Sequence, residues 1–265
     1  MKICLDAGHH GKYNQSPCNN AYYESDMNWA LHLLLKKYLE QQGIEVITTR
    51  GSQATDLALT SRGKKAKGCD LFISIHSNAV GSGVNESIDY PVAYVPLNGS
   101  CDKIGKLLAD GVADVMGTKQ KGQIQSKKGS TGMDYYGVIR GAVSVGVPGI
   151  ILEHSFHTNT KMTNWLLNSA NLDKMAKAEA EIIAAYFGVD KPDSTVYRIQ
   201  VGAFVNRAYA NELLAKVKQA GFDAFVTYTG GYYKVQVGAY KVKKNADAQL
   251  AAVKAAGFPA FITTA

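Results

Sequence analysis

The chain has 265 residues, of which 46% are hydrophobic and 19% charged, so it is large enough for about two domains and too apolar for intrinsic disorder. No stretch of 18 apolar residues occurs, which argues against membrane insertion, and four cysteines without regular spacing argue against a disulfide framework. The net charge of +7 is uneven, because residues 191–265 carry +6 of it; this part suits a polyanionic partner, or it has an ordinary solvated surface.

Residues 1–189 alternate short apolar runs with helical patterns. Strands are predicted at residues 3–5, 46–49, 71–75, 92–95 and 149–153, and helices at residues 27–39, 57–67, 102–116 and 171–187. Residues 117–147 are rich in glycine and lysine and lack a period, which predicts a loop. The alternation is typical of an α/β domain with a mostly parallel, twisted sheet flanked by helices. The polar residues 190–195 then predict a linker to a second domain, residues 196–265.

Two histidines and two glutamates suit a catalytic metal site. His9 follows the first predicted strand, His76 closes the third, Glu153 ends the fifth, and Glu24 lies at the start of the first helical pattern. Because the carboxyl ends of parallel strands meet at one edge of a sheet, we expect the two histidines to converge there. Three ligands and one free carboxylate are the parts of a catalytic zinc site. Taken singly, each residue also has a structural explanation, as a turn, a helix-capping acid or an ion-pair partner, and only their joint occurrence favours the metal site.

These residues lie in motifs that resemble a known family. The motifs are Asp6-Ala7-Gly8-His9, Glu24 with Asn28 four residues on, Arg62, Ser74-Ile75-His76-Ser77-Asn78-Ala79, and Leu152-Glu153 followed by Phe156. Together they resemble the zinc-dependent N-acetylmuramoyl-L-alanine amidases of the amidase_3 type, over about residues 2–187. The resemblance implies that His9, Glu24 and His76 bind one zinc ion and that Glu153 is the catalytic glutamate. It also implies cleavage of the amide between N-acetylmuramic acid and the L-alanine of the stem peptide.

Further residues near these motifs carry expectations of their own. We expect His32 on the exposed side of its helix, and His10, His154 and His157 beside the site, where they would touch substrate. The family usually has glycine before the phenylalanine that follows the catalytic glutamate, whereas this chain has Ser155.

The last 70 residues contain an internal repeat. Residues 197–204 match residues 233–240, and residues 221–227 match residues 257–263, both at an offset of 36. Each half predicts strand, helix, strand, so two halves form a β-α-β-β-α-β domain with one shared core. Strand alternation places Ile199, Val201, Val235 and Val237 under the helices. The open face is then predicted to present Arg198, Gln200, Phe204, Lys234, Gln236 and Tyr240, unless a bulge near the glycines resets the register or the two aromatic residues complete the core.

The repeated Gln-Val-Gly-Ala-Phe/Tyr segment resembles the SPOR domain, the sporulation-related repeat, over about residues 195–263. This resemblance implies binding of peptidoglycan, in particular of denuded glycan strands, which have lost their stem peptides. RNA-binding RRM domains share the β-α-β-β-α-β order, but the chain has no RNP1-like pattern, so a nucleic-acid partner is not expected.

The expected function is therefore hydrolysis of bacterial peptidoglycan by an amidase that also binds glycan, acting as a phage-type endolysin or as a mother-cell autolysin in sporulation. One alternative is a zinc peptidase that cuts stem peptides, and another is a non-catalytic wall-binding protein. No charged and apolar leader precedes the first predicted strand, so we expect synthesis in the cytoplasm without a signal peptide and action at the wall after lysis or holin-mediated release.

Overall fold

The computed structural model describes residues 1–81, 83–189, 195–241 and 243–264. These residues form two compact units, one on each side of residues 190–194. Most of the predicted linker, residues 190–194, lies outside the described residues. Each unit is described by itself below.

The first unit is built on a mostly parallel sheet, as predicted, with six strands in place of the five expected. Its strands are β1 (Lys2–Ala7), β2 (Glu45–Thr48), β3 (Leu71–Asn78), β4 (Val92–Tyr94), β5 (Gln123–Gln125) and β6 (Gly149–Phe156), in the order β2-β1-β3-β6-β4-β5. Strands β2, β1, β3 and β6 are parallel, and β4 runs antiparallel to β6. The carboxyl ends of β1, β3 and β6 therefore meet at one edge, which positions the site.

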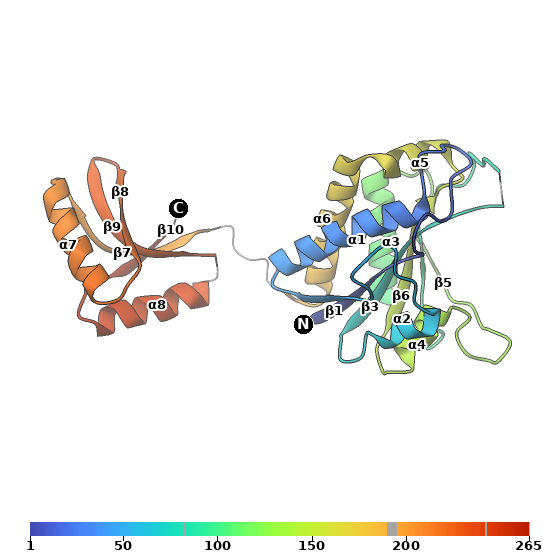
Figure 1. Cartoon of the computed structure of the whole chain (residues 1–265), viewed down its shortest axis with the longest axis horizontal. Coiled ribbons are helices and arrows are strands. Elements are labelled where there is room, and N and C mark those ends of the chain that lie inside the picture. Colours follow the sequence, from blue (N-terminus) through green and yellow to red (C-terminus); the bar gives the residue numbers. More distant parts are fainter. Residues whose placement is uncertain (82, 190–194, 242, 265) are drawn as a thin grey trace. The chain divides into compact units, whose positions relative to one another are not determined.

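Helices cover both faces of this sheet (Figure 1). One face packs against α1 (Glu24–Gln41), α3 (Asp102–Met116), α5 (Thr160–Leu167) and α6 (Ser169–Tyr186), and the other against α2 (Leu59–Lys64) and α4 (Gly137–Val143). Strand alternation separates the two cores: Ile3 and Leu5 belong to the larger core, whereas Cys4 belongs to the smaller one. In the described parts of the chain, no helix combines the length and the apolar character that crossing a membrane requires.

Three sequence expectations for this unit were wrong. Residues 117–147 are not all loop, because they contain β5 and α4, and the helix predicted at residues 57–67 is only the six-residue α2. All three residues of β5 are exposed and α4 includes two glycines, so neither shows a regular hydrophobic period. His32 is buried, at 2% exposure, because α1 packs on both sides of the expected apolar stripe.

The second unit has the predicted order of elements. They are β7 (Tyr197–Phe204), α7 (Arg207–Gln219), β8 (Ala224–Thr229), β9 (Tyr232–Tyr240), α8 (Lys243–Ala255) and β10 (Phe261–Thr264). The strands form an antiparallel sheet in the order β10-β7-β9-β8. Ile199, Val201, Val235 and Val237 are buried in one core, as the alternation predicted.

Candidate active site

His9, Glu24 and His76 converge at the carboxyl edge of the large sheet. His9 follows β1, His76 lies near the end of β3, and Glu24 is the first residue of α1. Gly8 makes the convergence possible: a Cβ atom at this position would lie 2.3 Å from the His76 ring. Glycine is therefore required where the two ligand-bearing segments meet.

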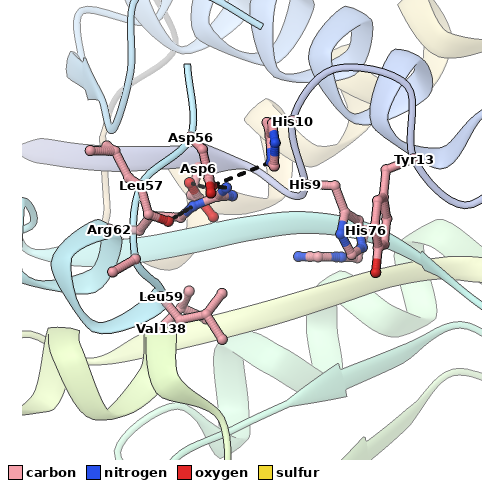
Figure 2. Close-up of a pocket in the computed structure, with 11 residues that line it drawn as sticks. Asp6, His9, His10, Tyr13, Asp56, Leu57, Leu59, Arg62, His76 and Val138 are labelled. Atoms are coloured by element: carbon pink, nitrogen blue, oxygen red, sulfur yellow. Dashed lines mark hydrogen bonds and ion pairs between the residues drawn. The ribbon is translucent and has the colours of Figure 1, made fainter. Parts of the chain in front are cut away.

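One ligand atom from each of these three residues lies within 4.8 Å of the other two. The Glu24 carboxylate is between the histidines, with Oε2 3.2 Å from His9 Nε2 and Oε1 2.8 Å from His76 Nδ1. The two imidazole rings are 4.9 Å apart and almost perpendicular, at 79°, and Tyr13 stacks on the outer face of His9 (Figure 2). Two imidazoles and one carboxylate are a donor set that suits zinc.

Glu24 is buried yet held in its ionised form. Burial alone raises the pKa of this carboxyl, but hydrogen bonds from the His76 and His9 rings hold its pKa well below the usual range. Three further donors support the charge: the Ser77 amide N at 3.1 Å, Asn14 Nδ2 at 2.6 Å and, more loosely, Asn28 Nδ2 at 3.5 Å. Five donors therefore fix the position of the Glu24 carboxylate.

Glu153 lies directly beside this cluster. It is paired with His76 in the register of β3 and β6, so the two side chains point to the same face of the sheet. Its Oε2 atom is buried and has no hydrogen-bond partner among the described residues. Burial, and then the negative charge of Glu24, raise the pKa of Glu153 well above its ordinary value. A buried carboxylate with an unused oxygen beside the cluster of His9, Glu24 and His76 can accept a proton.

A second group of buried polar residues fixes the end of β1. Asp6 is fully buried and accepts hydrogen bonds from Thr49 Oγ1 at 2.6 Å and Ser74 Oγ at 2.7 Å. Arg62, one of the residues in the family motifs, donates to the Ala7 carbonyl oxygen at 3.3 Å. Since these bonds tie β1 to its neighbours, they position His9 rather than contact a reacting group.

A cleft of about 300 Å³ opens beside His9 and His76 (Figure 2). Its polar end contains His10 and Asp56, which lie 3.3 Å apart, and Asp56 also pairs with Arg62 at 3.3 Å. Its remaining lining consists of apolar and aromatic side chains: Tyr13, Leu57, Ala58, Leu59 and Val138. A cleft with one polar end and one apolar wall can hold a substrate at the cluster.

His154 and His157 do not face this cleft, contrary to expectation. Both are buried, and His154 connects β6 to α6 through Glu179, with 2.5 Å between Nε2 and Oε1. His157 Nδ1 lies 2.9 Å from Ser77 Oγ. His154 alternates with Glu153 along β6 and therefore points to α6 on the other face of the sheet, and the ring of His157, which follows the strand, stacks on that of Tyr22. His10 is exposed and lines the cleft.

Ser155 has a backbone conformation that favours glycine. Its φ is 62°, in the left-handed region, where a side chain is strained. Glycine, which the family resemblance led us to expect here, adopts this conformation without strain. Here the Ser155 hydroxyl donates to the Asp89 carbonyl oxygen at 2.8 Å, which offsets part of the strain.

The open face of the small sheet has a symmetric row of side chains. Register places Phe261 of β10 beside Gln200 of β7, Gln200 beside Gln236 of β9, and Gln236 beside Phe225 of β8. Both glutamines are buried, and Phe261 is 55% exposed. We call these four residues the Phe-Gln-Gln-Phe row. Phe225 and Phe261 were missed, although the repeat relates them by the same offset of 36 that relates the two glutamines.

Two of the six predicted residues lie elsewhere. The register of β7 and β9 shifts twice, between Gln200 and Gly202 on β7 and between Val237 and Tyr240 on β9, so the residues beyond each shift change faces. Phe204 and Tyr240 consequently pack against the buried core, and their assignment to the open face is corrected. Arg198 and Lys234, each two residues from a glutamine, remain on the open face and are half-buried.

Comparison with known proteins agrees with both sets of motifs. Residues 3–185 match the family model for N-acetylmuramoyl-L-alanine amidase, and residues 193–264 match the model for the SPOR domain. The amidase CwlM of Bacillus licheniformis is 31% identical over 86% of this chain and 85% of its own length. A sporulation-specific N-acetylmuramoyl-L-alanine amidase of Bacillus subtilis is 29% identical, over 85% of this chain and 84% of its own.

A solved structure shares the fold of the first unit. The catalytic domain of CwlV, an N-acetylmuramoyl-L-alanine amidase from Bacillus (Paenibacillus) polymyxa, is 24% identical and superimposes with a TM-score of 0.59 over 71% of this chain and 99% of that domain. The chain therefore belongs to the N-acetylmuramoyl-L-alanine amidase family, carries a SPOR domain in residues 193–264, and is a peptidoglycan hydrolase.

Proposed function

We propose that the amidase activity of this protein depends on one zinc ion held by His9, Glu24 and His76. The observation that carries the proposal is their convergence within 4.8 Å, with an unpartnered carboxylate oxygen of Glu153 beside them. The donor set is that of catalytic zinc sites, in which three protein ligands leave a position open. Bound zinc would polarise the scissile carbonyl and acidify water, which supplies a nucleophile at neutral pH.

Substrate binding, exclusion of water and proton transfer would be carried out by residues of the chain. The cleft would hold the lactyl amide of the muramic acid against the cluster, with the apolar wall of Leu57, Leu59 and Val138 excluding water from one side. Glu153 would accept a proton from the attacking water. Because burial favours its protonated form, Glu153 would then deliver this proton to the departing amine of L-alanine.

The test is digestion of purified peptidoglycan with and without a chelator, followed by quantification of new amino termini and new reducing sugar ends. We expect new N-terminal alanine, its loss with chelator and its recovery on addition of zinc. Amino termini within the stem peptide would instead support the zinc peptidase alternative. New reducing ends would indicate a glycosidase and would refute the site assignment, and an absence of both products would leave a wall-binding protein.

For the second unit, we propose that the open sheet face binds glycan strands without stem peptides. Phenylalanine rings can stack on sugar rings, and the amides of Gln200 and Gln236 can hydrogen-bond to sugar hydroxyls. Since neighbouring strands are about 4.8 Å apart, the two ends of the Phe-Gln-Gln-Phe row are separated by roughly 14 Å. A flat face of this length requires direct approach to the sugars, which attached peptides would obstruct.

Substitution of both phenylalanines tests this proposal. The double variant Phe225→Ala/Phe261→Ala should bind denuded glycan at least about tenfold more weakly, because stacking of each aromatic ring contributes roughly 1 kcal/mol. Tyr209→Ala is the matched control, since Tyr209 is an exposed aromatic residue on α7. Equal loss in the control, or none in the double variant, would refute the assignment of this face.

The place of action that we propose is the bacterial cell wall, reached during lysis. A zinc-dependent amidase coupled to a glycan-binding unit suits both a phage-type endolysin and a mother-cell autolysin. The similarity to the sporulation-specific amidase of Bacillus subtilis supports the autolysin.

A further inference from the structure

The loop between β5 and α4, seen in Figure 1, carries the lining of a second concave site, which shares no residue with the active-site cleft. Residues 127–135 form a hairpin whose arms are joined by hydrogen bonds from the Tyr135 amide to the Lys127 carbonyl, at 2.8 Å, and from the Gly129 amide to the Met133 carbonyl, at 2.7 Å. Arg140 of α4 donates to the carbonyl oxygens of Asp134 and Tyr135 at 2.7 and 2.6 Å. The loop is therefore held by its own backbone and by the adjacent helix.

This loop encloses a concavity of about 490 Å³, which we call the basic concavity. Its lining contains three cations and no carboxylate: Lys127, Lys128, Gly129, Ser130, Thr131, Met133, Tyr135 and Arg140. The one acid of the hairpin, Asp134, instead accepts a hydrogen bond from the Leu97 amide at 2.8 Å. Within the described ranges, no carboxylate lies at ion-pair distance from Lys127, Lys128 or Arg140. A preformed site with unpaired cations attracts an anion.

The basic concavity adjoins the active-site cleft at the start of α4. Tyr135 lines it, and the following residue, Tyr136, packs on Tyr94 of β4 with 4.6 Å between the ring centroids. Tyr94 is paired with Ile151, two residues before Glu153 on β6. Burial, contact with Tyr94 and the charge of Glu153 all raise the pKa of Tyr136 above its ordinary value. Val138, two residues after Tyr136, lines the active-site cleft, and Arg140 of the same helix lines the basic concavity.

We propose that the basic concavity binds a carboxylate of the stem peptide and so orients the peptide half of the substrate; this inference rests on the proposed amidase function. A stem peptide ends in a carboxylate, and an extended peptide covers about 3.4 Å per residue, so a few residues span the ring-to-ring steps from Tyr94 through Tyr136 to Tyr135. Lysine and arginine are the side chains that recognise carboxylates, and Lys127 lies 3.8 Å above the Tyr135 ring, which restrains it. The site would favour substrates that have an intact, negatively charged peptide.

The test compares two soluble muropeptides, one with free carboxylates and one in which the same carboxylates are converted to amides. The full-length double variant Lys127→Gln/Lys128→Gln should have a KM about 3- to 20-fold higher for the charged muropeptide, with kcat changed less than about twofold. For the amidated muropeptide, the wild type and the double variant should have equal KM. Lys177→Gln is the matched control, because Lys177 is an exposed lysine on α6 outside both concave sites.

The remaining outcomes separate the two proposals. If the wild type cleaves neither muropeptide, the proposed function fails, and this is visible without any variant. If the wild type cleaves both but the double variant has an unchanged KM, or an equally raised KM for both, the carboxylate subsite is refuted. A loss of binding only to walls that retain phosphate polymers, with normal cleavage of both muropeptides, would assign the concavity to those polymers and would also refute the subsite. Because both lysines are exposed, the unfolding midpoint should stay within about 2 °C of the wild type, and this measurement excludes misfolding.

Discussion

Replacement of Glu153 by glutamine separates catalysis from metal binding. The substitution preserves the shape of the side chain but removes its negative charge and its capacity to accept a proton. Glu153 is not one of the three convergent ligands, and it is adjacent to His76 only through the pairing of β3 and β6. We therefore expect the Glu153→Gln variant to retain about one zinc ion per chain, as three protein ligands are sufficient for binding.

The expected loss of activity follows from the proton transfers assigned to Glu153. Removal of a general base and acid lowers the rate about 10²- to 10⁴-fold, which corresponds to roughly 3 to 5 kcal/mol of transition-state stabilisation. The folded state should not be weakened. Glu153 Oε2 is buried without a partner, and Glu24 repels its charge, so the neutral side chain should leave the free energy of unfolding unchanged or increase it by about 1 kcal/mol.

Three measurements on the same preparation check this reasoning: metal content, initial rate of N-terminal alanine release from purified wall, and thermal unfolding. Glu45→Gln is the control, since Glu45 is an exposed acid on β2 and should behave as wild type in all three. Near-normal release of alanine by Glu153→Gln with full zinc content would remove Glu153 from the mechanism. Loss of zinc in this variant would make Glu153 a ligand, and the assignment of three ligands would be wrong.

Three further predictions concern the cluster, the strained turn and a buried histidine. His76→Ala should lose both activity and most of its zinc, in contrast to Glu153→Gln, and retention of stoichiometric zinc would contradict the proposed ligand set. Ser155→Gly should be about 1 kcal/mol more stable than Ser155→Ala in chemical denaturation, because the left-handed φ of 62° strains alanine. At most positions alanine is the more stable of the two, and that order here would show that the turn relaxes. Burial lowers the pKa of His32 in the folded protein, so below pH 6.5 the unfolded chain binds more protons than the folded chain. The free energy of unfolding should therefore fall as the pH decreases below 6.5, by at most about 1.4 kcal/mol per pH unit. In metal-free protein His32→Gln should show a shallower fall than the wild type, and identical slopes would mean that His32 titrates normally in the folded state.

The features that were predictable from the sequence are those with a strict spacing. The parallel strands of the large sheet have continuous apolar runs, and helix α3 was predicted with its observed bounds because its apolar positions keep one period. The convergence of His9 and His76 followed from their places after two such strands. The position of Glu24 did not follow from spacing, because residues 8–23 form a loop whose path depends on contacts such as the hydrogen bond between Ser16 Oγ and the His157 carbonyl, 141 residues away.

The failures have a different physical origin. Helix α4 and strand β5 are short and are stabilised by neighbours rather than by their own period, so a local pattern does not reveal them. Phe204 and Tyr240 were placed on the wrong face because a one-residue bulge in each strand reverses every later side chain; Gly202 and Gly238 mark these places, and the bulge that they allow was an open alternative from the sequence. The internal repeat could have shown which aromatic residues lie on the open face. Phe225 and Phe261 are equivalent positions, and symmetric use of Gln200 and Gln236 implies symmetric neighbours on both flanks.

The two proposed binding preferences, taken together, predict a direction for the reaction on the wall. The basic concavity would recognise charged peptide that is still attached, whereas the SPOR domain would hold glycan from which peptide has been removed. Every cleavage converts the first kind of ligand into the second. Since both units belong to one chain, retention on a stripped strand raises the effective concentration of the active site near peptides that remain in the surrounding wall. Digestion should therefore accelerate after an initial lag on intact wall, and the Phe225→Ala/Phe261→Ala variant should show a steady rate without acceleration. A lag of equal length in this variant would mean that binding of the product does not direct the enzyme.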